Sequence, residues 1–261
     1  MKRIILAAIF AAACINASAQ QFMMSGANDE RTKGMEPANS EFYAPQPKVV
    51  TPGSITTNSA PSDAIVLFDG KDLSMWVNDE GEAADWKVNG DGTMTVDKSK
   101  GDIQTKDWFK DFQLHIEWMV PQNITGSGQA RGNSGVFLQG MYEVQILDCY
   151  QNDTYVNGMT ASIYKQNAPL ANPCRKPGEW NVYDIIYTAP TFKEDGTYRT
   201  RPTVTVIFNG VLVQNNTTIV GTTEYIGFPT VKAHGDGPIR LQMHGDPSEA
   251  ISFRNIWLRR L

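Results

Sequence analysis

The stretch GNSGVFLQGMYEVQILDCY, residues 132–150, decides the fold of this chain. Residues 136–139 and 142–147 are apolar arms on either side of Gly140-Met141. This pattern predicts a β-hairpin, and glycine at the first turn position suits a type II′ turn. In that register Leu138 pairs with Glu143, and Val136 pairs with Gln145.

The two faces of this hairpin differ in polarity, because successive side chains alternate across a strand. One face carries Ser134, Glu143 and Gln145, and the other carries Phe137, Val144 and Ile146. Asp148 follows Glu143 by five residues, so it falls on the apolar side unless a bulge turns it back. The polar face is either a solvated exterior or the lining of a binding site.

Two more segments divide in the same way. Residues 112–120 alternate strictly, with His115 and Glu117 on the polar face. Residues 239–244 also alternate, and their polar positions are Arg240, Gln242 and His244. If these strands are neighbours, the polar residues of all three segments form one concave groove that suits a polyhydroxylated ligand.

Long segments without a regular period join these strands and contain further candidate residues. The glycine-rich loop 122–135 returns into the hairpin at Arg131 and Asn133, and such loops often border binding sites. Residues 151–177 contain Tyr164, Lys165 and Asn172, and a connection of this length usually covers something or is functional.

Repeated short strands and almost no helical period predict an all-β fold. Strands are expected at residues 64–68, 180–187 and 253–258, and Asn209-Gly210 predicts a second hairpin between residues 203–208 and 211–214. Trp76 and Trp86 are large enough to anchor the core. The pattern favours a sandwich of two antiparallel sheets.

The start of the chain predicts export. Lys2 and Arg3 precede an apolar run and the small-residue pattern Ala17-Ser18-Ala19, which is typical of a secretory signal peptide over residues 1–19. Cys14 raises the alternative of a lipoprotein signal. Residues 20–62, rich in Pro, Asn, Ser and Gly, are expected to form a tether or loosely packed arm, and residues 63–261 the single domain. The protein is therefore predicted to be secreted or periplasmic, without an integral membrane segment.

Charge and cysteine content narrow the partners. The formal charge of −5 becomes −7 once Lys2 and Arg3 are removed, and no basic cluster is present, so nucleic acid is not an expected partner. Cys149 and Cys174 remain in a compartment where disulfides persist, and they are either paired or two buried thiols.

Several segments together resemble a known family. LFDGKDLSMW, DFQLHIEW, GNSGVFLQGMYEVQILD, CRKPGEWNVYDIIYTAP, VTVIFNGVLVQNN and GPIRLQMHGDP with ISFRNIWLRRL follow the order of the 3-keto-disaccharide hydrolase domain family. The resemblance covers residues 64–261 and implies a concanavalin A-like jelly roll. It also implies an enzyme that cleaves glycosidic bonds in sugars oxidised to a ketone at C3. Relatives often have glycine where Lys165 stands and a charged residue where Met141 stands, which affects substrate choice more than fold.

This chemistry needs a base for the C2 proton, an acid for the leaving oxygen and a group to hold the enolate. Glu143 and His244 are the expected base and acid pair, in either order, with Glu117 as a further catalytic group. Expected substrate-binding residues are Arg131, Asn133, Gln145, His115, Lys165, Arg240 and Gln242. An upstream sugar oxidoreductase is the implied partner.

Three alternatives stay open at this point. No cofactor is expected, but a divalent metal held by Glu143, Asp148 and His244 could polarise the ketone. An ordinary glycosidase would use Glu143 with a second carboxylate. A non-catalytic carbohydrate-binding module could have the same fold. Structural explanations compete for single residues: a Glu117–Arg240 bridge, or His244 bonded to the loop that follows it.

Overall fold

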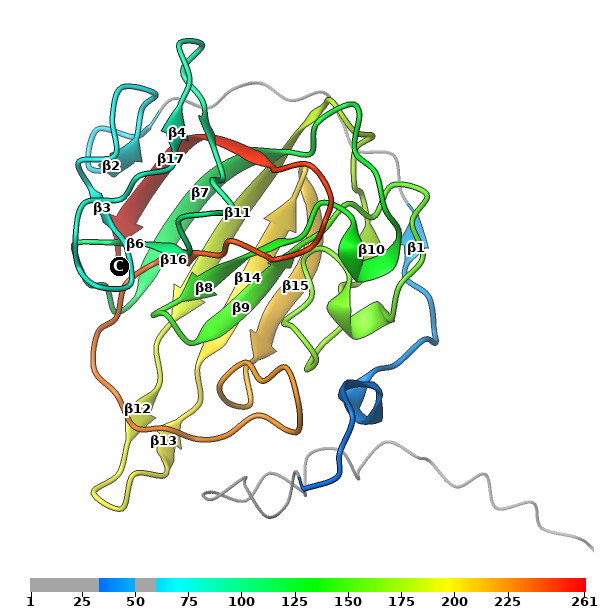
Figure 1. Ribbon diagram of the computed structural model, residues 1–261. Coiled ribbons are helices and arrows are strands. Elements are labelled where there is room, and N and C mark those ends of the chain that lie inside the picture. Colours follow the sequence, from blue (N-terminus) through cyan, green and yellow to red (C-terminus); the bar gives the residue numbers. More distant parts are fainter. Residues whose placement is uncertain (1–32, 50–59) are drawn as a thin grey trace, which may run out of the picture.

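The computed structural model describes residues 33–49 and 60–261 (Figure 1). The predicted leader, residues 1–19, lies outside these ranges. Within them, no helix is long and apolar enough to cross a membrane.

The larger sheet has eight strands and forms one layer of the molecule. Its order is β15 (Val211–Thr218), β14 (Thr203–Phe208), β11 (Trp180–Thr188), β7 (Phe112–Met119), β17 (Ser252–Arg260), β5 (Met94–Thr95) and β4 (Lys87–Val88), with β2 (Ile65–Phe68) also paired to β17. Every pairing in it is antiparallel. The predicted strand over residues 112–120 and the Asn209-Gly210 hairpin are confirmed.

The smaller sheet has five strands and lies across one face of the larger (Figure 1). Its order is β3 (Trp76–Val77), β6 (Ile103–Thr105), β16 (Arg240–Leu241), β8 (Ser134–Leu138) and β9 (Tyr142–Ile146). It too is antiparallel throughout. The predicted jelly-roll sandwich of two antiparallel sheets is confirmed.

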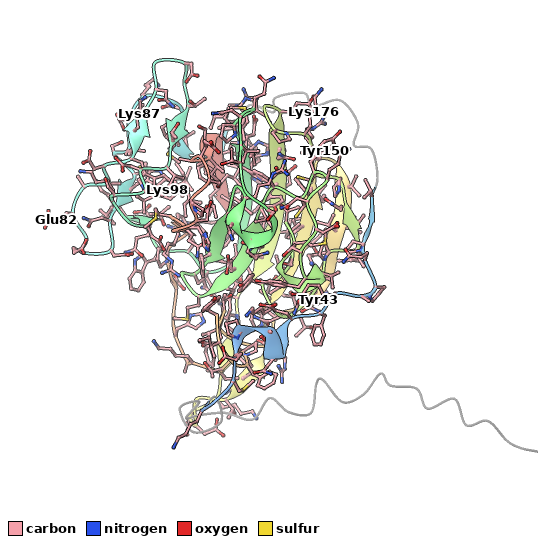
Figure 2. All side chains as sticks on the ribbon, turned by 45° about the vertical axis from the view of Figure 1, so that its right-hand side comes forward. Tyr43, Glu82, Lys87, Lys98, Tyr150 and Lys176 are labelled. Atoms are coloured by element: carbon pink, nitrogen blue, oxygen red, sulfur yellow. The ribbon has the colours of Figure 1, made fainter. Side chains whose placement is uncertain are left out.

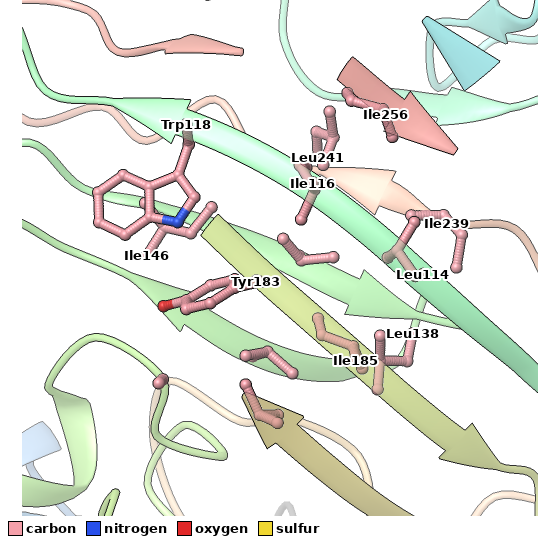
Figure 3. Packing of buried hydrophobic residues seen from close by; sticks show 14 of the residues in the cluster. Leu114, Ile116, Trp118, Leu138, Ile146, Tyr183, Ile185, Ile239, Leu241 and Ile256 are labelled. Atoms are coloured by element: carbon pink, nitrogen blue, oxygen red, sulfur yellow. The ribbon is translucent and has the colours of Figure 1, made fainter. Parts of the chain in front are cut away.

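The hydrophobic core fills the space between the sheets. Leu114, Ile116 and Trp118 of β7 point into it and meet Leu138 and Ile146 of the smaller sheet (Figure 3). Trp76 and Trp86 are buried as predicted, and each indole N–H donates to a backbone carbonyl. The apolar face of each sheet packs against the core. The polar faces of the two sheets therefore lie on opposite sides of the molecule.

Short elements complete the chain. These are the 3-10 helices η1 (Pro37–Ser40), η2 (Gly128–Ala130) and η3 (Val156–Gly158), the parallel pair β1 (Lys48–Val49) and β10 (Ala171–Asn172), and the hairpin β12 (Thr191–Phe192) and β13 (Tyr198–Thr200). We call residues 37–49 the arm, and β1 at its end pairs with β10 of the domain.

The central hairpin forms, but its predicted register is wrong by one residue. Leu138 pairs with Tyr142 and Phe137 with Glu143, because three residues, Gln139 to Met141, connect the strands around a turn centred on Gln139-Gly140. Both turn residues have positive φ (51° and 70°), as a type I′ turn requires. Gln139 is held there by hydrogen bonds from its amide to Phe109 O and from the Tyr187 hydroxyl to its Oε1.

This register changes which side chains share a face. Phe137 joins Glu143 and Gln145 on the polar face, and Ser134 lies on the opposite face with Ile146. The predicted placement of Phe137 and Ser134 was therefore wrong, whereas that of Glu143 and Gln145 was correct.

Cys149 and Cys174 are two buried free thiols, not a disulfide. The backbone N–H of Thr160 donates to Cys149 Sγ at 3.3 Å. Burial raises the pKa of the Cys149 thiol to about 12, so the thiol stays protonated and unreactive.

Candidate active site

A cavity of about 770 Å³ lies over the polar face of the smaller sheet. Its volume is in the range of sites that hold small-molecule ligands. The lining residues are Glu41, Gln129, Ala130, Asn133, Phe137, Glu143, Gln145, Tyr155, Tyr164, Thr223, Tyr225, Arg240, Gln242, His244, Gly245 and Asp246. Glu143 and His244, predicted from separate segments, therefore share one hollow.

Glu143 is a buried carboxyl group that faces this cavity. Its residue is 4 % exposed, and no hydrogen bond from the described residues reaches its side-chain oxygens. Its backbone is held by Thr223 Oγ1, which accepts from the Glu143 N–H at 2.9 Å. Burial raises the pKa of Glu143 to about 8, although the nearby positive charge of Arg240 opposes the shift. A carboxyl group in this state can donate or accept a proton near neutral pH.

His244 stands at the cavity beside a buried carboxylate. Its side chain is 36 % exposed, and its Nδ1 lies 3.1 Å from Asp246 Oδ2. Burial acts to raise the pKa of Asp246, but hydrogen bonds with His244 and Ser248 outweigh it and lower that pKa. The expectation that His244 bonds to the loop after it is thus correct, and the imidazole still faces the cavity. Sequence reasoning missed Asp246, although the spacing His-x-Asp was a signal for it.

Arg240 brings a positive charge to the same wall. Its guanidinium lies over the Phe137 ring at 4.1 Å, a cation–π contact that orients it. Its Nη1 is 3.7 Å from Asp102 Oδ2. The alternative of a Glu117–Arg240 bridge is wrong, since Glu117 pairs with Arg254.

A set of side-chain amides lines another part of the cavity. Gln129 Oε1 accepts from the amides of Gln145 (3.1 Å) and Asn133 (3.3 Å), and its own amide donates to Thr154 Oγ1 and Gly158 O. Gln145 Oε1 and Asn133 Oδ1 are buried and lack a hydrogen-bond partner among the described residues. Oriented acceptors of this kind suit sugar hydroxyl groups. Gln129 was missed because its loop has no periodic signal.

Glu117 and His115 do not belong to this cavity. They lie on the outer face of β7 in the larger sheet, on the other side of the core, so their predicted places in the groove were wrong. His115 Nδ1 is 2.7 Å from Asp184 Oδ1, and the ring stacks on Trp257. Strand alternation identified a polar face correctly but could not show which side of the sandwich it occupies.

Two predicted binding residues lie outside the cavity wall, so those placements were also wrong. Arg131 Nε is 2.7 Å from Oδ2 of the buried Asp148, and neither residue lines the cavity. Lys165 is buried, and its Nζ donates to Pro37 O and Tyr225 O. Its φ of 55° is positive, a backbone conformation that glycine adopts without strain.

Metal binding by Glu143, Asp148 and His244 is not supported by this placement. Asp148 does not line the cavity. In residues 33–49 and 60–261, no group of three or more His, Cys, Asp or Glu side chains could hold a metal ion.

A comparison with known families covers nearly the whole domain. Residues 63–259 match the family described as the 3-keto-alpha-glucoside-1,2-lyase-like domain. The chain belongs to this family. A solved protein of Parabacteroides distasonis, provisionally assigned as a glycosyl hydrolase, is 69 % identical, with 92 % of this chain and 100 % of that chain covered and a TM-score of 0.78.

A second structure shares the fold of this 3-keto-glucoside lyase-like domain. It is also a provisionally assigned glycosyl hydrolase of Parabacteroides distasonis, 19 % identical, with 76 % of this chain and 94 % of that chain covered and a TM-score of 0.54. No match to the chain is found among curated proteins.

Proposed function

We propose that this protein is an exported carbohydrate-active hydrolase that cleaves glycosidic bonds in sugars carrying a ketone at C3. One observation carries the proposal: the buried carboxyl group of Glu143 faces the same cavity as an imidazole backed by Asp246. Family membership supports the substrate class.

A C3 ketone makes elimination the accessible route. A base removes the acidified C2 proton and leaves an enolate, whose collapse breaks the bond between C1 and the leaving oxygen. An acid protonates that oxygen, so the alcohol departs and a C1=C2 double bond conjugated to the ketone remains. Water then adds, with its oxygen on C1 and a proton on C2, and the net change is hydrolysis.

The geometry favours one order of acid and base. With a pKa of about 8, Glu143 is mostly protonated at pH 7 and can supply the proton to the leaving oxygen. His244 then acts as the base, and the carboxylate of Asp246, whose Oδ2 lies 3.1 Å from His244 Nδ1, stabilises the imidazolium that forms. Arg240 is the cation that can hold the enolate oxygen.

The decisive experiment compares a disaccharide with its 3-keto form, each incubated with the purified mature chain. Cleavage of the keto form alone supports the proposal. Cleavage of the plain sugar would instead establish an ordinary glycosidase, and binding without turnover would establish a binding module. Glu143→Gln should lower kcat for the keto form by about 10²–10⁴-fold with folding retained.

Export and supply of the ketone belong to the same proposal. The N-terminal segment supports passage out of the cytoplasm, with a mature chain that starts at Gln20. The ketone must come from an oxidoreductase that acts on the C3 hydroxyl of the glycoside. Mass measurement of the exported protein tests the first point, and a mature chain that retains residues 1–19 would contradict it.

A further inference from the structure

The arm, residues 37–49, lies outside the matched family domain yet contributes to the cavity. Figure 2 shows it against the domain, with Tyr43 labelled. Glu41 of the arm lines the same cavity as Glu143. Its side chain is 12 % exposed, so it is largely enclosed rather than free in solvent.

A buried asparagine holds the backbone on both sides of Glu41. Asn157 Nδ2 donates to Ser40 O at 2.9 Å, and its Oδ1 accepts from the Phe42 N–H at 3.0 Å. The Val156 N–H also donates to Phe42 O. The Asn157 side chain thus hydrogen-bonds the backbone on both sides of Glu41, as a neighbouring strand would. The position of Glu41 is therefore fixed before any ligand binds.

Lys165 joins the arm to a second wall of the cavity. Its Nζ donates to Pro37 O at 3.0 Å and to Tyr225 O at 2.7 Å, and it lies 3.6 Å from Glu41 Oε1. Tyr225 itself lines the cavity. Burying the Lys165 cation costs free energy. Its contacts with Pro37 O and Glu41 offset that cost only while the arm stays in place.

A chain of tyrosines connects Glu41 to Glu143. The Tyr43 hydroxyl donates to Glu41 Oε2 at 3.0 Å, and the Tyr43 ring packs edge-on against Tyr155. The Tyr155 and Tyr164 hydroxyls are 2.7 Å apart, and the Tyr164 N–H donates to Glu143 O. Glu41 and Glu143 therefore reach one cavity from two distant segments of the chain, and Tyr155 and Tyr164 line that cavity with them.

We propose that the arm is a wall of the substrate site and that Glu41 binds hydroxyl groups of the sugar ring remote from the bond that breaks. A carboxylate accepts strong charge-assisted hydrogen bonds from hydroxyl groups. It also repels a negatively charged ring, so the site selects neutral disaccharides over those with a uronic acid in the remote ring. This inference rests on the proposed function, because it assigns the second ring of that substrate.

The test measures kcat and KM of the full mature chain for a neutral 3-keto-disaccharide and for one whose remote ring is a uronic acid. The variants are Glu41→Gln, Glu41→Asp and Glu194→Gln. Glu194 is an exposed acid beyond β12, so Glu194→Gln removes one negative charge without touching the cavity. Thermal melting checks that each variant is folded.

Glu41→Gln should raise KM for the neutral substrate about tenfold, equivalent to one strong hydrogen bond, with kcat within about threefold. The same variant should reduce the preference for neutral over acidic substrate, measured as the ratio of kcat/KM values. For both KM and this ratio, Glu41→Asp should fall between Glu41→Gln and wild type, and Glu194→Gln should match wild type. Equal KM values for Glu41→Gln and Glu194→Gln, with wild type active, would overturn the role of the arm alone. A wild-type protein that neither binds nor cleaves these sugars would overturn both proposals.

Discussion

At the scale of single residues, Glu143 is the most informative group in the molecule. A carboxyl group buried without a hydrogen-bond donor costs free energy when ionised, and this cost raises its pKa to about 8. Stability alone would not favour such an arrangement. Perturbed acids in cavities are typical of catalytic sites, where the proton must move near neutral pH.

The proton on Glu143 predicts the pH dependence of activity. If Glu143 is the acid, kcat/KM for the 3-keto substrate should fall above about pH 8, because the free enzyme then loses the proton it must donate. Initial rates from about pH 5 to pH 10 test this. A rise of kcat/KM through pH 8 would show instead that the ionised carboxylate is the base.

Gly135 predicts a way to move Glu143 without removing it. A Cβ at residue 135 would overlap Glu143 Oε1. Because the Glu143 side chain is flexible, its carboxyl group would move to relieve the overlap. Gly135→Ala should therefore lower kcat at least about tenfold, since an ångström of displacement disturbs catalytic geometry. The melting temperature should change by only a few degrees. Unchanged kcat would show that the position of the carboxyl group is not critical.

At the scale of elements, the two sheets carry two different polar clusters. The outer face of the larger sheet holds Glu117, whose carboxylate accepts from Arg254 Nε at 2.6 Å and from Asn255 Nδ2 at 2.8 Å. Burial acts to raise the pKa of Glu117, but hydrogen bonds with His115, Asn255 and Arg254 outweigh it and lower the pKa to about 2. This cluster is fully paired, unlike Glu143, and its geometry fits a structural role.

Glu117→Gln should therefore destabilise the protein without harming catalysis. Breaking a buried ion pair costs about 3 kcal/mol, and urea unfolding measures this loss. The kcat value should stay within about twofold of wild type at a temperature where the variant is folded. Glu143→Gln is the matched variant on the other sheet, with the opposite result: activity lost and stability kept. A large loss of kcat in folded Glu117→Gln would contradict this prediction and show that Glu117 contributes to catalysis.

At the scale of the whole molecule, titration of His115 and titration of Glu143 act on stability in the same direction. Burial alone lowers the pKa of His115, but hydrogen bonds with Asp184 and Glu117 more than offset it and raise the pKa to about 9. Its stabilisation is complete below its unfolded pKa of 6.5 and is lost as pH rises through 9. Glu143 binds its proton more tightly when folded, so between its ordinary pKa of 4.5 and its folded pKa of about 8 it also makes folding less favourable as pH rises.

The free energy of unfolding should therefore fall between about pH 5 and pH 9 as these groups lose protons. Urea titrations at several pH values measure this slope. In Glu143→Gln the part of the slope below pH 6.5 should flatten, because His115 loses its proton only at higher pH. A stability that rises with pH over this range would contradict both shifts.

The sequence by itself determined where the strands lie, which residues alternate on them, and the family of the domain. These properties depend on local periodicity and on short motifs, as the strand over residues 112–119 and the Asn209-Gly210 turn illustrate. Glu143, His244 and Gln145 were found for the same reason: each stands at a polar position of an alternating segment.

Only the tertiary structure decided which polar faces meet. His115 and Glu117 follow the same alternation as Glu143, yet the core lies between them, because the pairing of distant strands into two layers is set by packing and not by local pattern. The contributions of Gln129, Asp246 and Glu41 come from loops and from the arm, where no period exists to read. Their positions follow from side-chain hydrogen bonds between segments far apart in the chain, and these form only when the sandwich is assembled.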